Sequence, residues 1–254
     1  MLNACYKVFH KEGIDSNRDY CYNQITSVLS KSYPELDTPT VYLKNFDEVD
    51  EFYKEHPEFR FNKMPAFEEG GTGFPPTSGT VGVFASNYLA YKAFLNSPYD
   101  YLIIFEDDVV VSPTFVPVVE RYIQELPSGW DFFSVFVPPD CFKWYNSDYD
   151  IQGNTFVCRT YQDWSCACYI VNKTSAQKVI DDAEAKGIDD PIDWHIFNSR
   201  QLDMYKMRYT EEAYNRDAIY FNTYSPKPSA YHPVKFHTDT ANESTITSTE
   251  FYWG

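Results

Sequence analysis

The chain has 254 residues, of which 43% are hydrophobic and 23% are charged, a composition typical of a folded protein and unlike that of disordered or fibrous chains. Its formal net charge of −16 opposes tight non-specific binding to nucleic acid phosphates and to anionic membranes. Because no apolar run approaches the roughly 18 residues of a membrane-spanning helix and the start lacks a secretory signal, we expect one cytoplasmic domain over residues 1–254 without a membrane span.

The first part of the chain alternates between expected strands and helices. Polarity that alternates along the chain indicates strands, and apolar residues at helical spacing indicate helices. The expected elements, in chain order, are a strand at 6–10, a helix at 18–30, a strand at 39–43, a helix at 47–56, a Gly- and Pro-rich loop at 68–80 and a helix at 81–96.

The second part begins with a continuous apolar run, 101–105, which predicts a strand buried on both faces of a parallel sheet. After it we expect a helix at 114–126, strands at 130–137 and 164–171 around an irregular loop at 140–154, a helix at 175–186, and no clear period over 209–254. The predicted fold class is α/β, with a mostly parallel sheet, helices on both faces and an irregular C-terminal segment. The six cysteines predict reduced, buried thiols, with Cys166 and Cys168 on one strand face.

Three acids, Glu106, Asp107 and Asp108, directly follow the apolar run. Ligands of open parallel sheets bind at the carboxyl ends of strands, because helices cover both faces. If the strand continues, Glu106 and Asp108 project to the same side, about 7 Å apart along the backbone. Carboxylates suit Mg²⁺ or Mn²⁺, which can bind phosphate oxygens. The alternative, that the acids begin a solvated loop, is disfavoured by the buried strand before them.

An ordered set of segments resembles glycosyltransferase family 25. Residues 79–87 resemble its glycine-rich helix start, with Asn87 where the family usually has His, and residues 101–115 resemble its apolar strand, Glu-Asp-Asp and following Phe. Further segments that resemble the family are 130–132, 167–178, 191–193 and, loosely, 229–245.

The resemblance implies a GT-A-like fold, a UDP-sugar donor, Mn²⁺ or Mg²⁺, and transfer to an acceptor hydroxyl with inversion. Residues 1–110 would then form the nucleotide-sugar-binding half and 111–254 the acceptor-binding half. The implied metal ligands are Glu106, Asp108 and a late histidine, His237 or else His232. Asp193 is the implied general base, although an Asp at this position could instead cap a helix. The residues expected to bind the donor are Lys11, Arg18, Ser86, Asn87 and Asp107.

Several functions share these features. The acceptor could be a glycan, a protein hydroxyl or a hydroxymethylated base in phage DNA, in which case the enzyme would work in the host cytoplasm. A metal-dependent nuclease or phosphotransferase would also use clustered carboxylates, but it would need more acids and a basic surface. A non-catalytic sugar-binding module is the remaining alternative, which the exchange of His for Asn87 leaves open.

Overall fold

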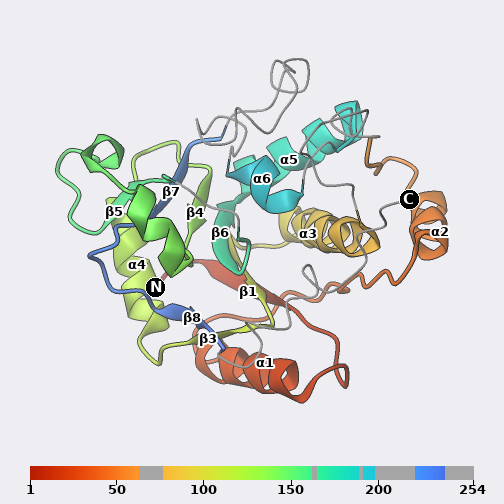
Figure 1. Ribbon diagram of the computed structural model, residues 1–254, viewed down its shortest axis with the longest axis horizontal. Helices are drawn as coiled ribbons and strands as arrows, with labels where there is room; N and C mark the ends of the chain where they lie inside the picture. Colours follow the sequence, from red (N-terminus) through yellow and green to blue (C-terminus); the bar gives the residue numbers. More distant parts are fainter. Residues whose placement is uncertain (63–76, 162–164, 189–190, 198–220, 238–254) are drawn as a thin grey trace.

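A six-stranded sheet forms the centre of the protein in the computed structural model, which describes residues 1–62, 77–161, 165–188, 191–197 and 221–237 (Figure 1). Its strands lie in the order β1-β2-β6-β4-β7-β5, and a second, two-stranded sheet pairs β3 with β8. The strands are β1 Ala4–Phe9, β2 Tyr101–Glu106, β3 Val109–Val111, β4 Phe132–Ser134, β5 Val157–Arg159, β6 Cys168–Asn172, β7 Thr223–Pro226 and β8 Val234–Phe236.

Four strands of the central sheet, β1, β2, β4 and β7, run in one direction. β1 pairs with β2 and β4 with β7 in parallel, whereas β6 lies antiparallel between β2 and β4 and β5 is an antiparallel edge strand. The sheet is therefore mostly parallel in direction, as predicted, with two reversed strands.

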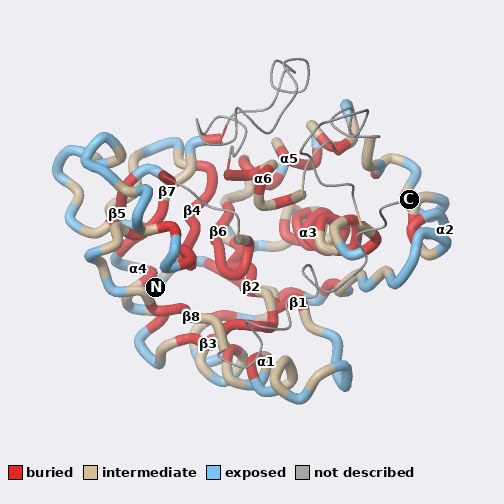
Figure 2. The backbone as a smooth tube through the Cα atoms, in the orientation of Figure 1, coloured by how far each residue is buried: buried red, intermediate tan, exposed pale blue. Residues whose placement is uncertain are grey.

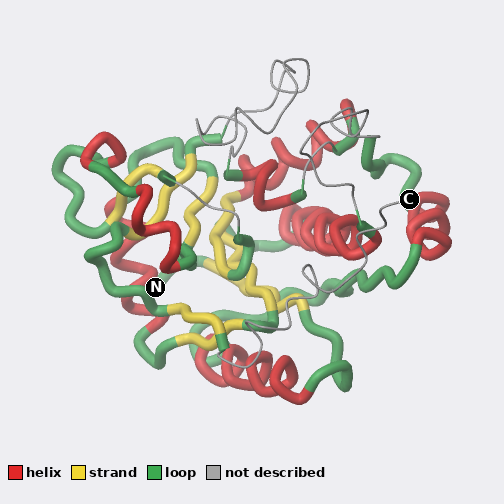
Figure 3. Tube along the Cα trace, viewed as in Figure 1, coloured by secondary structure: helices red, strands yellow, loops and turns green. Residues whose placement is uncertain are grey.

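Helices cover both faces of this sheet, which confirms the predicted α/β class (Figure 3). On β2, Leu102 and Ile104 face a core formed with α2, α3, α5 and α6, while Ile103 and Phe105 face a core formed with α1 and α4. Figure 1 shows α3, α5 and α6 grouped together, apart from α1 and α4. The helices are α1 Ser16–Leu29, α2 Phe46–Glu55, α3 Ser78–Leu95, α4 Phe115–Glu125, α5 Lys173–Lys186 and α6 Ile192–Ile196.

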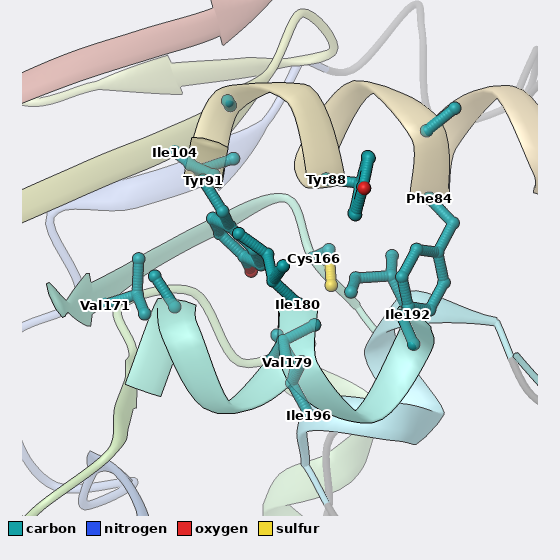
Figure 4. Close-up of a cluster of buried hydrophobic side chains, with 14 of the residues drawn as sticks. Phe84, Tyr88, Tyr91, Ile104, Cys166, Val171, Val179, Ile180, Ile192 and Ile196 are labelled. Carbon is teal, nitrogen blue, oxygen red and sulfur yellow. The ribbon is translucent and has the colours of Figure 1, made fainter. Parts of the chain in front are cut away.

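The core on the α3 side is rich in large side chains. Figure 4 shows Phe84, Tyr88 and Tyr91 of α3 directed at side chains of α5 and α6. On β2 all four residues from Leu102 to Phe105 are fully buried, and Figure 2 shows the same burial along the neighbouring strands. The prediction of a strand buried on both faces is confirmed.

The predicted strand at 39–43 is wrong, because another segment occupies the edge of β1. The backbone N–H of Tyr6 donates to the carbonyl of Pro34 (3.0 Å), and the N–H of Leu36 donates to the carbonyl of Tyr6 (2.7 Å). Val41 instead donates its N–H to the Ser86 hydroxyl (2.8 Å), so this segment lies along α3 as an extended loop.

Two further expectations need correction. Part of the segment predicted to lack regular structure forms β7 and β8, while residues 209–220 and 238–254 lie outside the described residues. All six cysteines are buried, as predicted, but Cys166 and Cys168 do not share a strand face. Because β6 begins only at Cys168, Cys166 precedes the strand and joins the α3 core, whereas Cys168 faces the α1 core.

The predicted loop at 140–154 contains the short 3₁₀ helices η2 (Pro139–Trp144) and η3 (Ser147–Tyr149).

Candidate active site

The acidic triplet lies where β2 ends. Glu106 is the last residue of the strand, and its N–H donates to the carbonyl of Ala167 (3.0 Å); Asp107 and Asp108 form the turn into β3. Glu106 is half-buried, and Asp107 and Asp108 are 6% and 8% exposed. These acids therefore do not begin a solvated loop. Burying several negative charges together costs free energy unless other groups or ions compensate them.

Burial and mutual repulsion raise the pKa of two of these acids. The pKa of Glu106 lies well above its ordinary value, first because of burial and then because of the charges of Asp108, Asp193 and Asp107. Burial raises the pKa of Asp108 to about 6, although the positive charge of Arg18 opposes the shift. A bound cation would relieve this repulsion, because it would favour the ionised form of both carboxyl groups.

Asp193, the proposed base, belongs to a different element from the acidic triplet. It lies in the first turn of α6, whose N-cap is Pro191, and one of its carboxylate oxygens accepts the N–H of Trp194 (3.0 Å). Asp193 is therefore not the N-cap residue, which was the alternative to its proposed role as a base. The negative charge of Asp193 helps to raise the pKa of Glu106, so Asp193 lies within electrostatic range of the end of β2.

His237 lies beside Asp108 because the C-terminal segment returns to the site. β8 pairs antiparallel with β3, and the N–H of His237 donates to the carbonyl of Asp108 (2.9 Å). His232 lies elsewhere: its ring packs on Phe142 (centroids 4.8 Å apart) and its Nε2 faces the carbonyl of Lys227 (3.2 Å). Of the two predicted histidines, only His237 is joined to the acidic triplet by a backbone hydrogen bond.

The implied metal fits the chemistry of Glu106 and Asp108, which are hard oxygen donors. Within the described ranges, however, no group of three His, Cys, Asp or Glu side chains has the arrangement of a metal site. The predicted set of Glu106, Asp108 and His237 is thus adjacent in the fold, but it is not preassembled as a complete ligand shell.

The side chain of Asp107 has partners that differ from those of Glu106 and Asp108. One of its carboxylate oxygens lies 2.8 Å from His10 Nδ1 and the other accepts a hydrogen bond from Arg18. The predicted donor-binding residues Arg18 and Asp107 are therefore brought together by the structure. Lys11, the third charged residue of that set, is exposed, and its ammonium group lies 4.7 Å from the centre of the Tyr42 ring.

Ser86 and Asn87, also predicted to bind the donor, are buried in α3 and bonded to protein groups. The Ser86 hydroxyl accepts the N–H of Val41 and donates to the carbonyl of Gly82 (2.9 Å). The amide of Asn87 donates to the carbonyl of Val83 (2.9 Å) and accepts from the Tyr169 hydroxyl. In this structure both side chains hold α3 in place, and contact with a donor remains a prediction.

Two residues that were not predicted from the sequence, His10 and Tyr169, contact predicted site residues. Tyr169 is fully buried and donates to Asn87, and its pKa is raised first by burial and, least of the causes, by the charge of Glu106. The register of β2 with β6 places Tyr169 opposite Ile104, on the face to which Glu106 also belongs. His10 directly follows β1, and that position at a strand's carboxyl end was the available signal.

Comparison with known proteins gives one family. The profile of glycosyltransferase family 25, described as an LPS biosynthesis protein family, matches residues 44–195, which is more than half of the chain. The matched range contains the acidic triplet and Asp193 but neither His10 nor His237. No curated protein matches the chain.

Among solved structures, the chain is similar to the apo crystal structure of mouse xyloside xylosyltransferase 1. The identity is 11% and the TM-score 0.30, over 87% of this chain and 96% of that one. Across the described parts of the chain, none of the helices is both long enough and apolar enough to cross a membrane.

Proposed function

Since the chain belongs to glycosyltransferase family 25, we propose that it transfers a sugar from a UDP-sugar to an acceptor hydroxyl with the help of Mn²⁺ or Mg²⁺. The observation that carries the proposal is the acidic cluster at the end of β2, where Glu106 and Asp108 are held in mutual repulsion. A buried group of like charges costs stability, and a site for a cation and a diphosphate explains why the protein retains it.

The metal would be held by Glu106 and Asp108, with His237 the nearest candidate for a further ligand and the donor's phosphate oxygens completing the shell. When bound, such an ion neutralises the charge that develops on the departing diphosphate. Arg18 lies close enough to raise this positive potential further, since its charge acts on all three acids of the triplet.

Asp193 is the proposed general base. Its carboxylate would accept the proton of the acceptor hydroxyl as that oxygen attacks the anomeric carbon and the bond to the diphosphate breaks, which gives inversion. Two features support this role: its position in the first turn of α6 and the effect of its charge on the pKa of Glu106. The donor and the acceptor would then meet between the end of β2 and α6.

The decisive experiment measures donor binding and transfer with a panel of UDP-sugars in the presence of Mn²⁺. We expect binding of one or a few donors, loss of transfer on addition of EDTA, and its return with excess Mn²⁺. Asp108→Asn should lower transfer at least about 100-fold, and Asp193→Asn should lower kcat by about 10² to 10⁴ while donor binding is retained. Asp148→Asn, a change of an exposed acid in η3, is the matched control and should leave both unchanged.

The acceptor is defined by offering three classes of hydroxyl: glycans, protein hydroxylysine and hydroxymethylated DNA. Transfer to any one of them supports the proposed reaction and names its class. Donor binding without transfer to any acceptor or to water, together with unchanged binding in Asp193→Asn, would instead indicate a sugar-binding protein. Wild-type protein that binds neither Mn²⁺ nor any UDP-sugar would contradict the proposal.

A further inference from the structure

His10 lies between two carboxylates at the edge of the candidate site. Its Nδ1 is 2.8 Å from an oxygen of Asp107, its Nε2 is 3.1 Å from an oxygen of Asp19, and its side chain is only 7% exposed. The ring stacks on Tyr22, with centroids 4.6 Å apart and an interplanar angle of 15°. We call the group of His10, Arg18, Asp19 and Asp107 the His10 clamp.

Both carboxylates of the clamp also accept hydrogen bonds from other groups of the protein. The Asp19 oxygen that faces His10 also accepts the backbone N–H of Gly13 (3.1 Å), and Asp107 accepts from Arg18, so both carboxylates act as acceptors. An imidazole nitrogen donates to such an oxygen when it carries a proton. With a proton on Nδ1, His10 donates to one oxygen of Asp107 while Arg18 donates to the other, so the two side chains hold this carboxylate from both of its oxygens.

The clamp joins three segments that surround the proposed donor site. His10 follows β1, Arg18 and Asp19 belong to the first turn of α1, and Asp107 belongs to the turn between β2 and β3. Asp107 is flanked in sequence by Glu106 and Asp108, so fixing its carboxylate also fixes the backbone that carries these two acids. Side chains that orient metal or phosphate ligands commonly act in this indirect way.

We infer that His10 is a positioning residue that holds Asp107 and thereby orients Glu106 and Asp108 for the nucleotide donor. The inference rests on the proposed function and adds to it, because it assigns Asp107 to the support of the site and gives a role to a residue outside the region matched by the family. The bond to Asp107 is the one that matters, and the bond to Asp19 serves mainly to orient the ring.

Two substitutions separate these bonds. In His10→Asn the amide nitrogen replaces Nδ1 and keeps a donor toward Asp107, whereas in His10→Gln it replaces Nε2 and keeps a donor toward Asp19. Both remove the stacking on Tyr22, so a general loss of packing affects them equally. The measurements are the affinity for UDP in the presence of Mn²⁺, by calorimetry, and the thermal unfolding of each variant.

We expect His10→Asn to bind UDP with Mn²⁺ within about threefold of wild type and His10→Gln to bind about tenfold more weakly or worse, at similar stability. Equal affinity of the two folded variants would overturn the inference, because the effect would then follow packing and not the bond to Asp107. Wild-type affinity in His10→Gln would overturn it as well.

A second measurement separates a failed clamp from a failed function. In ¹⁵N-resolved NMR spectra of the wild-type protein at neutral pH, the His10 ring should show a hydrogen-bonded N–H proton at Nδ1. That proton supports the clamp even if the wild type binds no UDP, in which case the proposed function is wrong. A ring whose Nδ1 carries no proton refutes the clamp whatever the variants do, including the case in which neither variant folds.

Discussion

At the scale of single residues, the buried hydroxyl of Tyr169 shows how a polar group determines the arrangement of two elements. It donates to the amide oxygen of Asn87 and lies 2.6 Å from the hydroxyl of Tyr91, so it ties β6 to α3 in the core. A buried partner left without its hydrogen bond loses its share of solvation, which costs about 1–3 kcal/mol.

Tyr169→Phe should therefore lower the free energy of unfolding by about 1–3 kcal/mol, because Asn87 and Tyr91 keep polar atoms that the change leaves unpaired. Urea unfolding followed by circular dichroism measures the effect. Tyr231→Phe is the control, since that hydroxyl bonds Ser112 at the surface, and it should change stability by less than about 0.5 kcal/mol. Similar losses of unfolding free energy in the two variants would show that burial of the Tyr169 hydrogen bonds does not determine their contribution to stability.

His232 gives a pH-dependent prediction away from the acidic cluster. Burial lowers the pKa of this histidine, although bonds to the backbone carbonyls of Lys227 and Pro228 oppose the shift. The unfolded chain therefore binds a proton at a higher pH than the folded protein does. The stability contributed by the neutral ring is complete above the unfolded pKa of about 6.5 and is lost as pH falls below it.

The change His232→Gln removes this titration and keeps a donor for the Lys227 carbonyl. We expect the free energy of unfolding of wild type to fall more steeply between pH 7.5 and 5 than that of the variant. Urea unfolding at intervals of half a pH unit tests the expectation. Parallel curves for the two proteins would mean that the His232 pKa is the same in the folded and unfolded states.

At the scale of elements, α5 ends at a glycine that two constraints require. Gly187 has φ +74°, and a Cβ there would lie 2.5 Å from the side-chain oxygen of Asn62. That side chain in turn donates to the carbonyl of Lys186 (2.8 Å), which is one of the last carbonyls of the helix. The end of α5 is thus fixed by a residue more than 120 positions earlier in the chain.

Gly187→Ala should destabilise the protein by more than Gly129→Ala does. Gly129 also has positive φ (+82°) but has open space around it, so its substitution costs only the left-handed conformation, about 1–2 kcal/mol. In Gly187→Ala the new Cβ must also displace the Asn62 side chain, which adds to the loss of stability. Thermal unfolding of both variants measures the difference, and an equal loss would show that Asn62 moves without cost.

Elements that carry their own signal in sequence were predicted well, and those that depend on a partner were not. Strand β2 could be predicted from its continuous apolar run, and helix α4 from its apolar face. The strands β7 and β8 are four and three residues long, and they exist because β4 and β3 offer backbone partners. The segment at 39–43 has strand-like composition, but the edge of β1 is already occupied.

The same division applies to the site. Glu106 and Asp108 could be predicted because they follow a buried strand, which is a local pattern. The interaction of Asp193 with Glu106 and that of His237 with Asp108 depend on the packing of α6 and β8. The role of Asp107 could not be read from the triplet, because its partners come from the end of β1 and from α1.

At the scale of the whole molecule, the net charge of −16 and the sequence pI of about 4.6 imply self-repulsion at neutral pH. Salt screens exposed charges, since the Debye length falls from about 30 Å at 0.01 M to about 8 Å at 0.15 M. Raising NaCl from 10 to 200 mM should therefore raise the stability by about 1 kcal/mol, or about 2–4 °C in Tm. Calorimetry with NaCl and with choline chloride measures this. A Tm that falls with both salts would mean that ion pairs outweigh the repulsion.

Three features could be predicted from the amino-acid sequence: the α/β class, the buried strand that ends in three acids, and the family to which those segments belong. These features are local, because hydrophobic period and strand-end position are written in consecutive residues. The partners of the three acids depend on how the chain packs: Asp107 bonds His10 and Arg18, the carbonyl of Asp108 accepts the N–H of His237, and the charge of Asp193 acts on Glu106. The protonation and the hydrogen bonds of a buried acid depend on the groups that the fold places around it. These groups lie up to 129 residues away in the chain.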